Sequence, residues 1–472
     1  MTATSLALAG SRGRLLLVTG VLALALAAGL LINWVAAAVL ALLGTGFVAL
    51  PFFLAPALVV VVCGASFVNN ESGQLTLYLS GVTLLLTYAL LCLAVAWITR
   101  RWGLPRSGLT TALLVLEIST LFAALHGVFA GNSLRYLGLE LLPLLGLTTA
   151  LMVGGLRLAR STIVLAFRVF VVVGLVHVAL GLYGYMMSGT RLGGIYFTPI
   201  PGMLAVLTFN LLLRSRSPGR SLGLVLLTCV FTLQQIISLT RGYWMGLAAG
   251  LLFSGLLYAG RGPGAGQRWR RLAANVGLAG ACLALGSVAV ANWFGWGNVW
   301  TLLGTRLVSS SGTTLSSETA SNVARMIEWW TVVRHIQTAP WFGHGLGYSI
   351  HVRYPFFPVV STQWFVHELY LWIWLKQGIV GMFALVFVLF QGLRLGARGA
   401  LRLTDGDEAG WCAGAAGATL YIAVLGLTNY PLAQVNSTFL LAFLWGVALA
   451  LQAPDRSEIV WRRHRADPLT HP

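Results

Sequence analysis

Long apolar runs constrain this chain more than any other feature of its sequence. Runs of about 17 to 25 apolar residues alternate with short loops along most of the 472 residues. A helix needs roughly 20 apolar residues to cross a bilayer, and no long strand-like alternation is present, so the runs predict helices rather than barrel strands. With 58% hydrophobic and 9% charged residues, the chain has too much apolar surface for one soluble core. We therefore expect an all-α, polytopic integral membrane protein.

The arginines between these runs predict an orientation. The formal charge is +18, but Lys376 is the one lysine and the arginines form short clusters between apolar runs. Membrane orientation explains such clusters, so no nucleic-acid partner is expected. The positive-inside rule assigns 21 arginines to the cytoplasmic side of the membrane and puts both termini there. Seven arginines remain on the predicted outer side: Arg135, Arg191, Arg241, Arg306, Arg325, Arg334 and Arg353.

The apolar runs predict about 12 to 14 transmembrane helices. The 14-helix interpretation has spans at 15–31, 34–48, 50–66, 75–98, 108–130, 137–156, 162–187, 200–213, 221–239, 243–260, 272–292, 367–393, 409–428 and 436–452. Residues 15–66 are so continuously apolar that two of their three spans are doubtful, which makes twelve helices the next choice. No convincing cleavage site follows the first span, so it is interpreted as a retained helix rather than a signal peptide.

The spans divide the chain into five predicted regions. N-terminal transmembrane helices occupy residues 1–185, and 186–293 hold further helices with outer arginine loops. Residues 294–366 are predicted to form one large outer loop. C-terminal helices follow at 367–453, and a cytoplasmic tail occupies 454–472. All five cysteines fall inside predicted spans, so they are expected to pack as small residues without disulfides.

The predicted outer loop is rich in arginine and poor in carboxylates. No Asp lies on the predicted outer side, and the spacings of His335, His344, His351 and His367 match no zinc pattern. No metal and no cofactor are therefore expected. Guanidinium groups bind phosphate oxygens bidentately, and a histidine accepts a proton near neutral pH. Arginines together with one base predict a metal-independent displacement on a phosphate-linked substrate.

Four motifs in a fixed order carry a resemblance to a known family. They are an outer loop with Arg191, Gly193, Gly194 and Pro199; a helix end reading Ser238-Leu-Thr240-Arg241-Gly242; Arg325-x-x-x-Trp329 followed by Pro340 and Gly343-x-Gly345-x-Gly347; and His367-Glu368-Leu-Tyr370-Leu371 followed by Gly378-x-x-Gly381. In this order they resemble the bacterial O-antigen ligase and polymerase superfamily. The resemblance covers roughly residues 185 to 450.

The resemblance implies a GT-C-like helical bundle in the bacterial cytoplasmic membrane, with residues 294–366 as its catalytic outer loop. It also implies transfer of a glycan from an undecaprenyl-diphosphate-linked donor to an acceptor hydroxyl at the outer face of that membrane, with inversion. Arg241 and Arg325 would hold the diphosphate, and His367 would be the base. The candidate substrate-binding residues are Arg191, Glu368, Arg334 and Tyr370. Glu368 stands where the family usually has Asn, and this glutamate could orient His367, raise its basicity or face water.

Several alternatives remain open from the sequence. Within the family, the acceptor is another glycan for a polymerase, lipid A core for a ligase, or a protein hydroxyl for an O-oligosaccharyltransferase; membrane lipids are partners in each case. Outside it, the competing classes are a lipid-linked glycan transporter or flippase and a membrane scaffold.

Single residues also have simpler interpretations. Arg241 could anchor at lipid headgroups, Arg325 could pair with Glu328 three residues on, and His367 could be an interfacial residue. The Gly378-x-x-Gly381 pattern predicts a helix break that places Lys376 near the headgroups. Glu117, His126 and Glu140 lie in or near spans and receive no role.

Overall fold

The computed structural model confirms a mostly helical membrane protein. It describes residues 103–156, 158, 160–188, 198–238, 240–260, 265–294, 317–354, 360–403 and 406–453. Within these residues, seven helices are long and apolar enough to cross a membrane. The spans predicted before residue 103 and the tail 454–472 lie outside the described residues.

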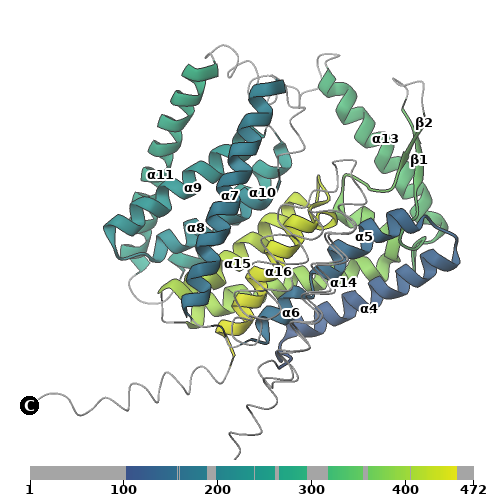
Figure 1. The fold of residues 1–472 in the computed structure, drawn as a ribbon, viewed down its shortest axis with the longest axis horizontal. Coiled ribbons are helices and arrows are strands. Elements are labelled where there is room, and N and C mark those ends of the chain that lie inside the picture. The colour runs from purple at the N-terminus through teal and green to yellow at the C-terminus, as the bar shows by residue number, and fades with distance from the viewer. Residues whose placement is uncertain are drawn as a thin grey trace, which may run out of the picture.

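The described chain contains the following elements, labelled in Figure 1. They are α4 (Gly108–Phe129), α5 (Leu134–Gly146), α6 (Thr149–Gly154), α7 (Arg160–Ser188), α8 (Ile200–Arg214), α9 (Pro218–Ile237), α10 (Arg241–Ala259), α11 (Ala265–Phe294), α13 (Ser317–Thr338), β1 (Ile350–Arg353), β2 (Val360–Gln363), α14 (Leu369–Arg402), α15 (Gly406–Leu425), the 3-10 helix η3 (Pro431–Ala433) and α16 (Val435–Leu451).

Every span predicted from residue 108 onward coincides with an observed helix, except that the predicted span 137–156 is divided into α5 and α6. Pro143 lies inside α5, and the backbone tightens after it. Leu147 N–H donates to Leu144 O at 3.0 Å, and Thr148 N–H to Leu145 O at 3.0 Å, so three-residue hydrogen bonds replace the α-helical pattern there.

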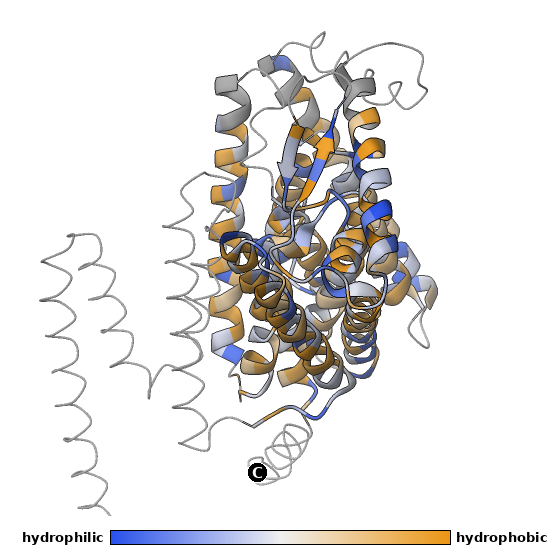
Figure 2. Ribbon diagram, turned by 90° about the vertical axis from the view of Figure 1, so that its right-hand side faces the viewer, coloured by the Kyte–Doolittle hydropathy of each residue, from blue (hydrophilic) through white to orange (hydrophobic). Residues whose placement is uncertain are grey.

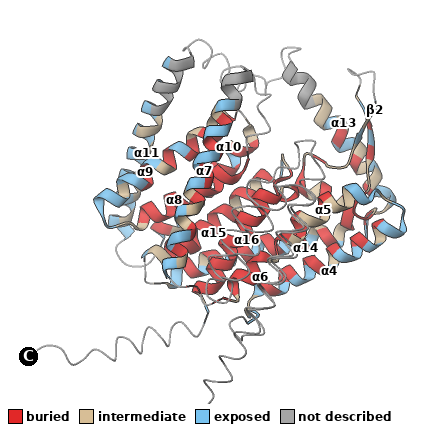
Figure 3. Cartoon of the chain, viewed as in Figure 1, coloured by how far each residue is buried: buried red, intermediate tan, exposed pale blue. Residues whose placement is uncertain are grey.

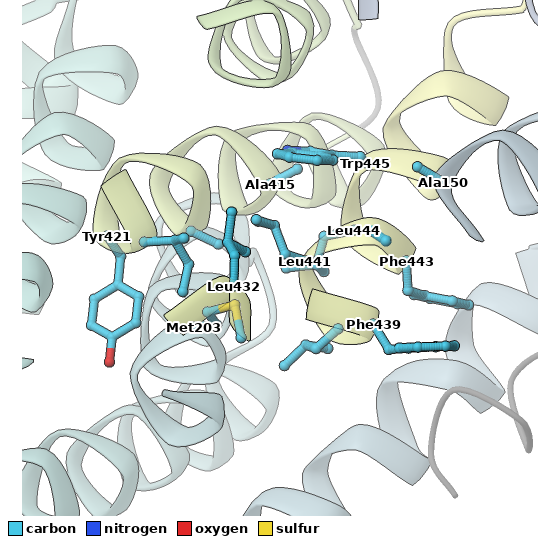
Figure 4. Packing of buried hydrophobic residues seen from close by; sticks show 14 of the residues in the cluster. Ala150, Met203, Ala415, Tyr421, Leu432, Phe439, Leu441, Phe443, Leu444 and Trp445 are labelled. Carbon is cyan, nitrogen blue, oxygen red and sulfur yellow. The ribbon is translucent and has the colours of Figure 1, made fainter. Parts of the chain in front are cut away.

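The core is formed by helices that are buried on all sides. All residues of α16, and residues 200–213 of α8, are buried, as Figure 3 shows. Figure 4 shows Phe439, Phe443 and Trp445 of α16 among the packed core side chains. The indole N–H of Trp445 donates to Thr419 Oγ1 of α15 at 2.8 Å, which satisfies the polar edge of a buried ring.

Glycines of α15 allow the neighbouring helices to approach closely. A Cβ at Gly414 would lie 2.5 Å from Leu207 of α8, and one at Gly417 would lie 2.5 Å from Val206. Because lipid gives helices no hydrophobic drive to associate, small residues that permit close backbone packing are typical of membrane helix contacts. On the lipid side, Figure 2 shows hydrophobic residues along the bundle, and α4 exposes Ile118 and Leu125 by more than half.

Basic residues gather where helices connect at one end of the bundle. There Asp407, at the start of α15, pairs with Arg220 of α9 at 2.8 Å and with Arg160 of α7 at 3.3 Å. Helix α14 ends at this same end, at Arg402, and we call it the arginine end. Helix α13, the hairpin and the start of α14 lie at the opposite end, which we call the loop end (Figure 1).

The predicted break in α14 is present at Gly378, whose φ of 70° and ψ of −173° are non-helical. It frees backbone groups that the preceding turn Gly343–Gly347 takes up: His344 N–H donates to Leu375 O at 2.9 Å and Gly345 N–H to Lys376 O at 3.0 Å. Figure 1 shows the turn's neighbours α4, α5 and α14 together. The break therefore docks the loop onto the bundle.

A buried ion pair fixes the same region. Lys376 of α14 pairs with Glu140 of α5, and both side chains are fully buried. Lys376 Nζ also donates to Tyr348 O and, at 2.9 Å, to Trp364 O, which flank the hairpin on its two sides. Gly347 N–H donates to Glu140 Oε2 at 2.6 Å. Lys376 is thus covered by the loop end, and its charge is paired inside the protein.

The hairpin is an addition to the predicted all-helical pattern. Strands β1 and β2 pair antiparallel, with Ile350 opposite Gln363 and Arg353 opposite Val360. Ile350 and Val352 are buried while His351 and Arg353 are exposed, so one face packs on the loop end. Four-residue strands are too short for their alternation to stand out in the sequence.

Candidate functional site

His367 lies directly before α14, and its ring is held by a carboxylate from α13. The ring Nδ1 lies 2.8 Å from Glu328 Oε2, and the backbone N–H of His367 donates to Glu328 Oε1 at 2.8 Å. The Glu328 side chain is 1% exposed, whereas that of His367 is 32% exposed. One face of the imidazole is therefore fixed by the protein and the rest remains open to a ligand.

Helix α13 presents Glu328 to the bundle because of its apolar spacing. Val332 and Ile336 follow Glu328 at intervals of four residues and are both buried. Residues at this spacing lie above one another on a helix, so Glu328 belongs to the inward stripe of α13. The sequence spacing alone would have suggested the pairing of Glu328 with Arg325, and the contact with His367 shows where the carboxylate points.

Aromatic rings surround His367. The ring of Phe365 lies 5.2 Å from the imidazole, and the ring of Tyr430 lies 5.8 Å from it at 80°. Phe365 and Tyr430 contact each other at 4.8 Å. Edge-to-face packing of this kind restricts the orientation of the rings, so the imidazole is held both by hydrogen bonds and by packing.

Glu368 caps helix α14. Its carboxylate accepts the backbone N–H groups of Leu371 at 2.7 Å and Tyr370 at 3.3 Å. These are the positions that an N-cap side chain serves, and Asn is among the preferred residues there. Glu368 thus performs at this position the capping that an Asn would perform. The residue is 8% exposed, so it does not face water, and burial raises the pKa of its carboxyl from 4.5 to about 7 despite the opposing effect of the two N–H donors.

Arg241 reaches the site region from a different element. It is the first residue of α10, where the helix dipole favours anions. The next residue, Gly242, packs against Thr428 so tightly that a Cβ would clash with the threonine hydroxyl. Leu369 N–H, at the start of α14, donates to Gly426 O at 2.9 Å. The start of α10 and the start of α14 therefore both contact the turn after α15, which also carries Tyr430.

The other residues singled out in the sequence occupy different surroundings. Arg325 is partly buried on α13, one turn before Glu328 and on the same side of the helix. Arg334 is exposed farther along α13. Tyr370 donates its hydroxyl to Ala423 O of α15 at 2.7 Å. Arg191 lies outside the described residues.

A second polar cluster lies at the end of α13. Tyr348 Oη is 2.8 Å from His335 Nδ1, and the ring of His344 stacks on that of Tyr348 at 4.2 Å. Burial, together with the charges of His344 and His351, lowers the pKa of His335. Across the described residues, no group of three or more His, Cys, Asp or Glu is arranged to hold a metal ion.

Two residues of the site were not recognised from the sequence as neighbours of His367. Tyr430 carries no motif signal, since it lies about 60 residues after the histidine in an ordinary turn. Glu328 carried a signal in its spacing to Val332 and Ile336, which marks it as inward facing in a helix. That spacing predicts burial, but a partner on another element can be found only from the fold.

Comparison with known proteins adds one finding. Residues 223–386 match the family described as O-antigen ligase, and this segment contains Arg241, Arg325, Glu328 and His367. The curated proteins contain no match to the chain. The match supports the resemblance of this segment to the O-antigen ligase and polymerase superfamily, a glycan-transferring family, and together with the apolar helices it points to a bacterial membrane protein.

Proposed function

We propose that this protein transfers a glycan from an undecaprenyl-diphosphate-linked donor to an acceptor hydroxyl at the outer face of the cytoplasmic membrane. The observation that carries the proposal is that a partly exposed histidine and a motif arginine lie near one turn. His367 contacts Tyr430 of the turn Gly426–Tyr430, the residue after Arg241 packs against Thr428 of the same turn, and both His367 and Arg241 lie within the segment that matches the O-antigen ligase family.

The chemistry follows from the two types of group. His367 accepts the proton of the acceptor hydroxyl as the oxygen of that hydroxyl bonds to the anomeric carbon of the donor. The bond from that carbon to the diphosphate oxygen breaks, and undecaprenyl diphosphate leaves with the bonding electron pair. Because attack and departure occur on opposite sides of the anomeric carbon, its configuration inverts.

Arginines neutralise the leaving group in this proposal. Arg241 lies at a helix N-terminus, where the backbone also favours an anion, and Arg325 lies one turn from the carboxylate that contacts His367. Guanidinium groups bind diphosphate oxygens in pairs and keep their charge when partly buried. Stabilisation of charge that develops on the leaving group lowers the barrier to its departure.

The outer face is proposed from the charge distribution. Arg160, Arg214, Arg220 and Arg402 lie at the arginine end, away from His367. Cytoplasmic connections carry the excess of arginine in membrane proteins. The loop end, with the candidate site, then faces outward, where lipid-linked glycans are the available donors and no nucleotide is needed.

The test uses the purified protein in lipid nanodiscs with an undecaprenyl-diphosphate-linked oligosaccharide, and it measures the release of undecaprenyl diphosphate. We expect His367→Gln to reduce turnover by about 100-fold or more, because a general base contributes that much. Arg241→Lys and Arg325→Lys should each reduce turnover by about 10-fold or more, because a point charge cannot replace a bidentate fork.

Arg353→Lys is the matched control, since Arg353 lies exposed on the outer face of β1 and should keep full turnover. If His367→Gln releases undecaprenyl diphosphate as fast as the wild type, the assignment of His367 as the base is refuted. A transporter would move the donor and leave its diphosphate bond intact. Expression in polymerase-deficient and ligase-deficient strains, scored by the surface-glycan ladder, then identifies the acceptor: longer chains indicate a polymerase and attachment to lipid core a ligase.

A further inference from the structure

We infer that Glu328 is a positioning residue that sets the tautomer of His367 and so leaves the catalytic nitrogen free to accept a proton. This inference rests on the proposed function of His367 as the base. It concerns a residue that touches neither donor nor acceptor in the proposed reaction and acts through the histidine.

Both carboxylate oxygens of Glu328 contact His367. Glu328 Oε1 accepts the backbone N–H of His367, and Oε2 lies 2.8 Å from the ring Nδ1. A carboxylate offers only acceptors, so the ring nitrogen that faces it must carry the hydrogen. In the neutral imidazole the other nitrogen, Nε2, is then without a hydrogen and has a lone pair to receive the hydroxyl proton.

The buried surroundings of Glu328 favour the tautomer of His367 that carries its hydrogen on Nδ1. The carboxylate is 1% exposed, so water does not compete for its oxygens. A buried carboxylate without donors would be costly, and the backbone and ring N–H groups of His367 both help to compensate it. Reversing the tautomer would bring a bare nitrogen against a buried negative oxygen, which the low polarity of the site penalises.

Helix α13 couples this carboxylate to the proposed diphosphate-binding group. Arg325 and Glu328 lie one turn apart, and Val332 and Ile336 anchor the same helix in the core. A rigid helix that carries both groups keeps the proton acceptor and the leaving group in a constant relation. Precise positioning of this kind accounts for large rate effects of small displacements.

The geometry makes the glutamine variant informative. In Glu328→Gln one side-chain atom must still accept the backbone N–H of His367, and only the amide oxygen can do so. The amide NH₂ is then directed at Nδ1 of His367. Because Nδ1 must accept this hydrogen bond, the ring hydrogen moves to Nε2. The variant keeps the size of the side chain and reverses the tautomer, so the base is blocked without being removed.

The experiment combines kinetics with ¹⁵N NMR of histidine-labelled protein in nanodiscs at a pH where the imidazole is neutral. The His367 signals are those missing from His367→Gln. In the wild type we expect the hydrogen on Nδ1, and in Glu328→Gln on Nε2. We expect kcat of Glu328→Gln to fall about 100- to 10,000-fold with KM for the donor within about threefold, as expected for a wrongly oriented base.

Two further variants complete the design. Glu328→Asp keeps two acceptors on a shorter side chain, so it should keep the wild-type tautomer and lose less kcat than Glu328→Gln. This variant also preserves the test if glutamine prevents folding. Glu408→Gln makes the same chemical change at the start of α15, at the arginine end, and should leave both kcat and the His367 signals unchanged.

The outcomes separate this inference from the proposed function. If Glu328→Gln retains the hydrogen on Nδ1, or turns over like the wild type with a reversed tautomer, the positioning role is refuted. If the wild type releases no undecaprenyl diphosphate while the NMR signals show the expected reversal, the proposed function fails and the tautomer assignment stands.

Discussion

Glu368 shows how one residue can depart from a family pattern and keep its local role. Its carboxylate accepts the N–H groups of Tyr370 and Leu371, which would otherwise lack partners at the start of α14. The longer side chain reaches the same donors as an Asn would. The cost is a buried carboxyl whose charged form is disfavoured, which is why its pKa is raised to about 7.

This raised pKa predicts a pH-dependent stability. The folded protein binds the Glu368 proton more tightly than the unfolded chain, so the stabilisation is fully present below pH 4.5 and is lost as the pH rises through about 7. Glu368→Gln is neutral throughout and can still cap. The free energy of unfolding of the variant relative to the wild type should therefore rise by about 3 kcal/mol between pH 4.5 and 8.

Thermal unfolding in detergent, followed for both proteins across this pH range, measures the difference. Comparing the two proteins at each pH cancels the titration of all other groups. A difference that stays constant from pH 4.5 to 8 would show that the Glu368 pKa is not raised by folding.

At the scale of elements, the turn Gly343–Gly347 and the break in α14 form one unit. Gly343, Gly345 and Gly347 all have positive φ, a conformation that favours glycine. They also lie against other backbones: a Cβ at Gly345 would be 2.5 Å from Gly127 N of α4, and one at Gly347 would be 2.5 Å from Ser133 O. The alternating glycines therefore serve close packing as well as backbone conformation.

These two roles can be separated by a pair of alanine variants. Gly131 has a φ of 72°, and a Cβ there meets nothing within 4 Å, so Gly131→Ala should cost about 1 kcal/mol for the backbone alone. Gly345 has a φ of 83° and no room, so Gly345→Ala should cost about 3 kcal/mol or more. Denaturation of both variants in detergent measures the costs, and equal losses would mean that the contact with α4 contributes nothing.

At the scale of the whole molecule, charge is separated between the two ends. Asp407 joins Arg160 and Arg220 at the arginine end, while the loop end is held by the buried pair of Glu140 and Lys376. The first group is partly exposed and contributes little to stability. Breaking the buried pair from one side would leave an uncompensated charge and cost far more. The loop end is thus anchored strongly where the candidate site is located.

The proposed orientation predicts which end reagents can reach. Ser217 is exposed at the arginine end and Gln337 is exposed on α13 at the loop end. In intact spheroplasts, a membrane-impermeant maleimide should label Gln337→Cys. It should label Ser217→Cys only after the membrane is permeabilised. The wild type, whose cysteines lie in apolar runs, controls for background labelling. Immediate labelling of Ser217→Cys with protection of Gln337→Cys would invert the orientation and remove the site from the outer face.

The sequence by itself determined the helical membrane class, the positions of most helices from residue 108 onward and the break near Gly378. It did so because these features depend on local properties: length of an apolar run, charge between runs, and glycine spacing. It also identified His367, Arg241 and Arg325 as candidates through their motifs, while their roles remain proposals.

Only the tertiary structure decided what these residues contact. Glu328 lies 39 residues before His367, and Glu140 lies more than 200 residues before Lys376, yet each carboxylate meets its partner inside the protein. Neither the spacing of α13 nor the glycine pattern of α14 indicated these contacts between distant residues. The packing of α5, α13 and α14 creates them, because a buried charge is compensated by whichever donors the fold brings to it, and sequence distance does not limit that choice.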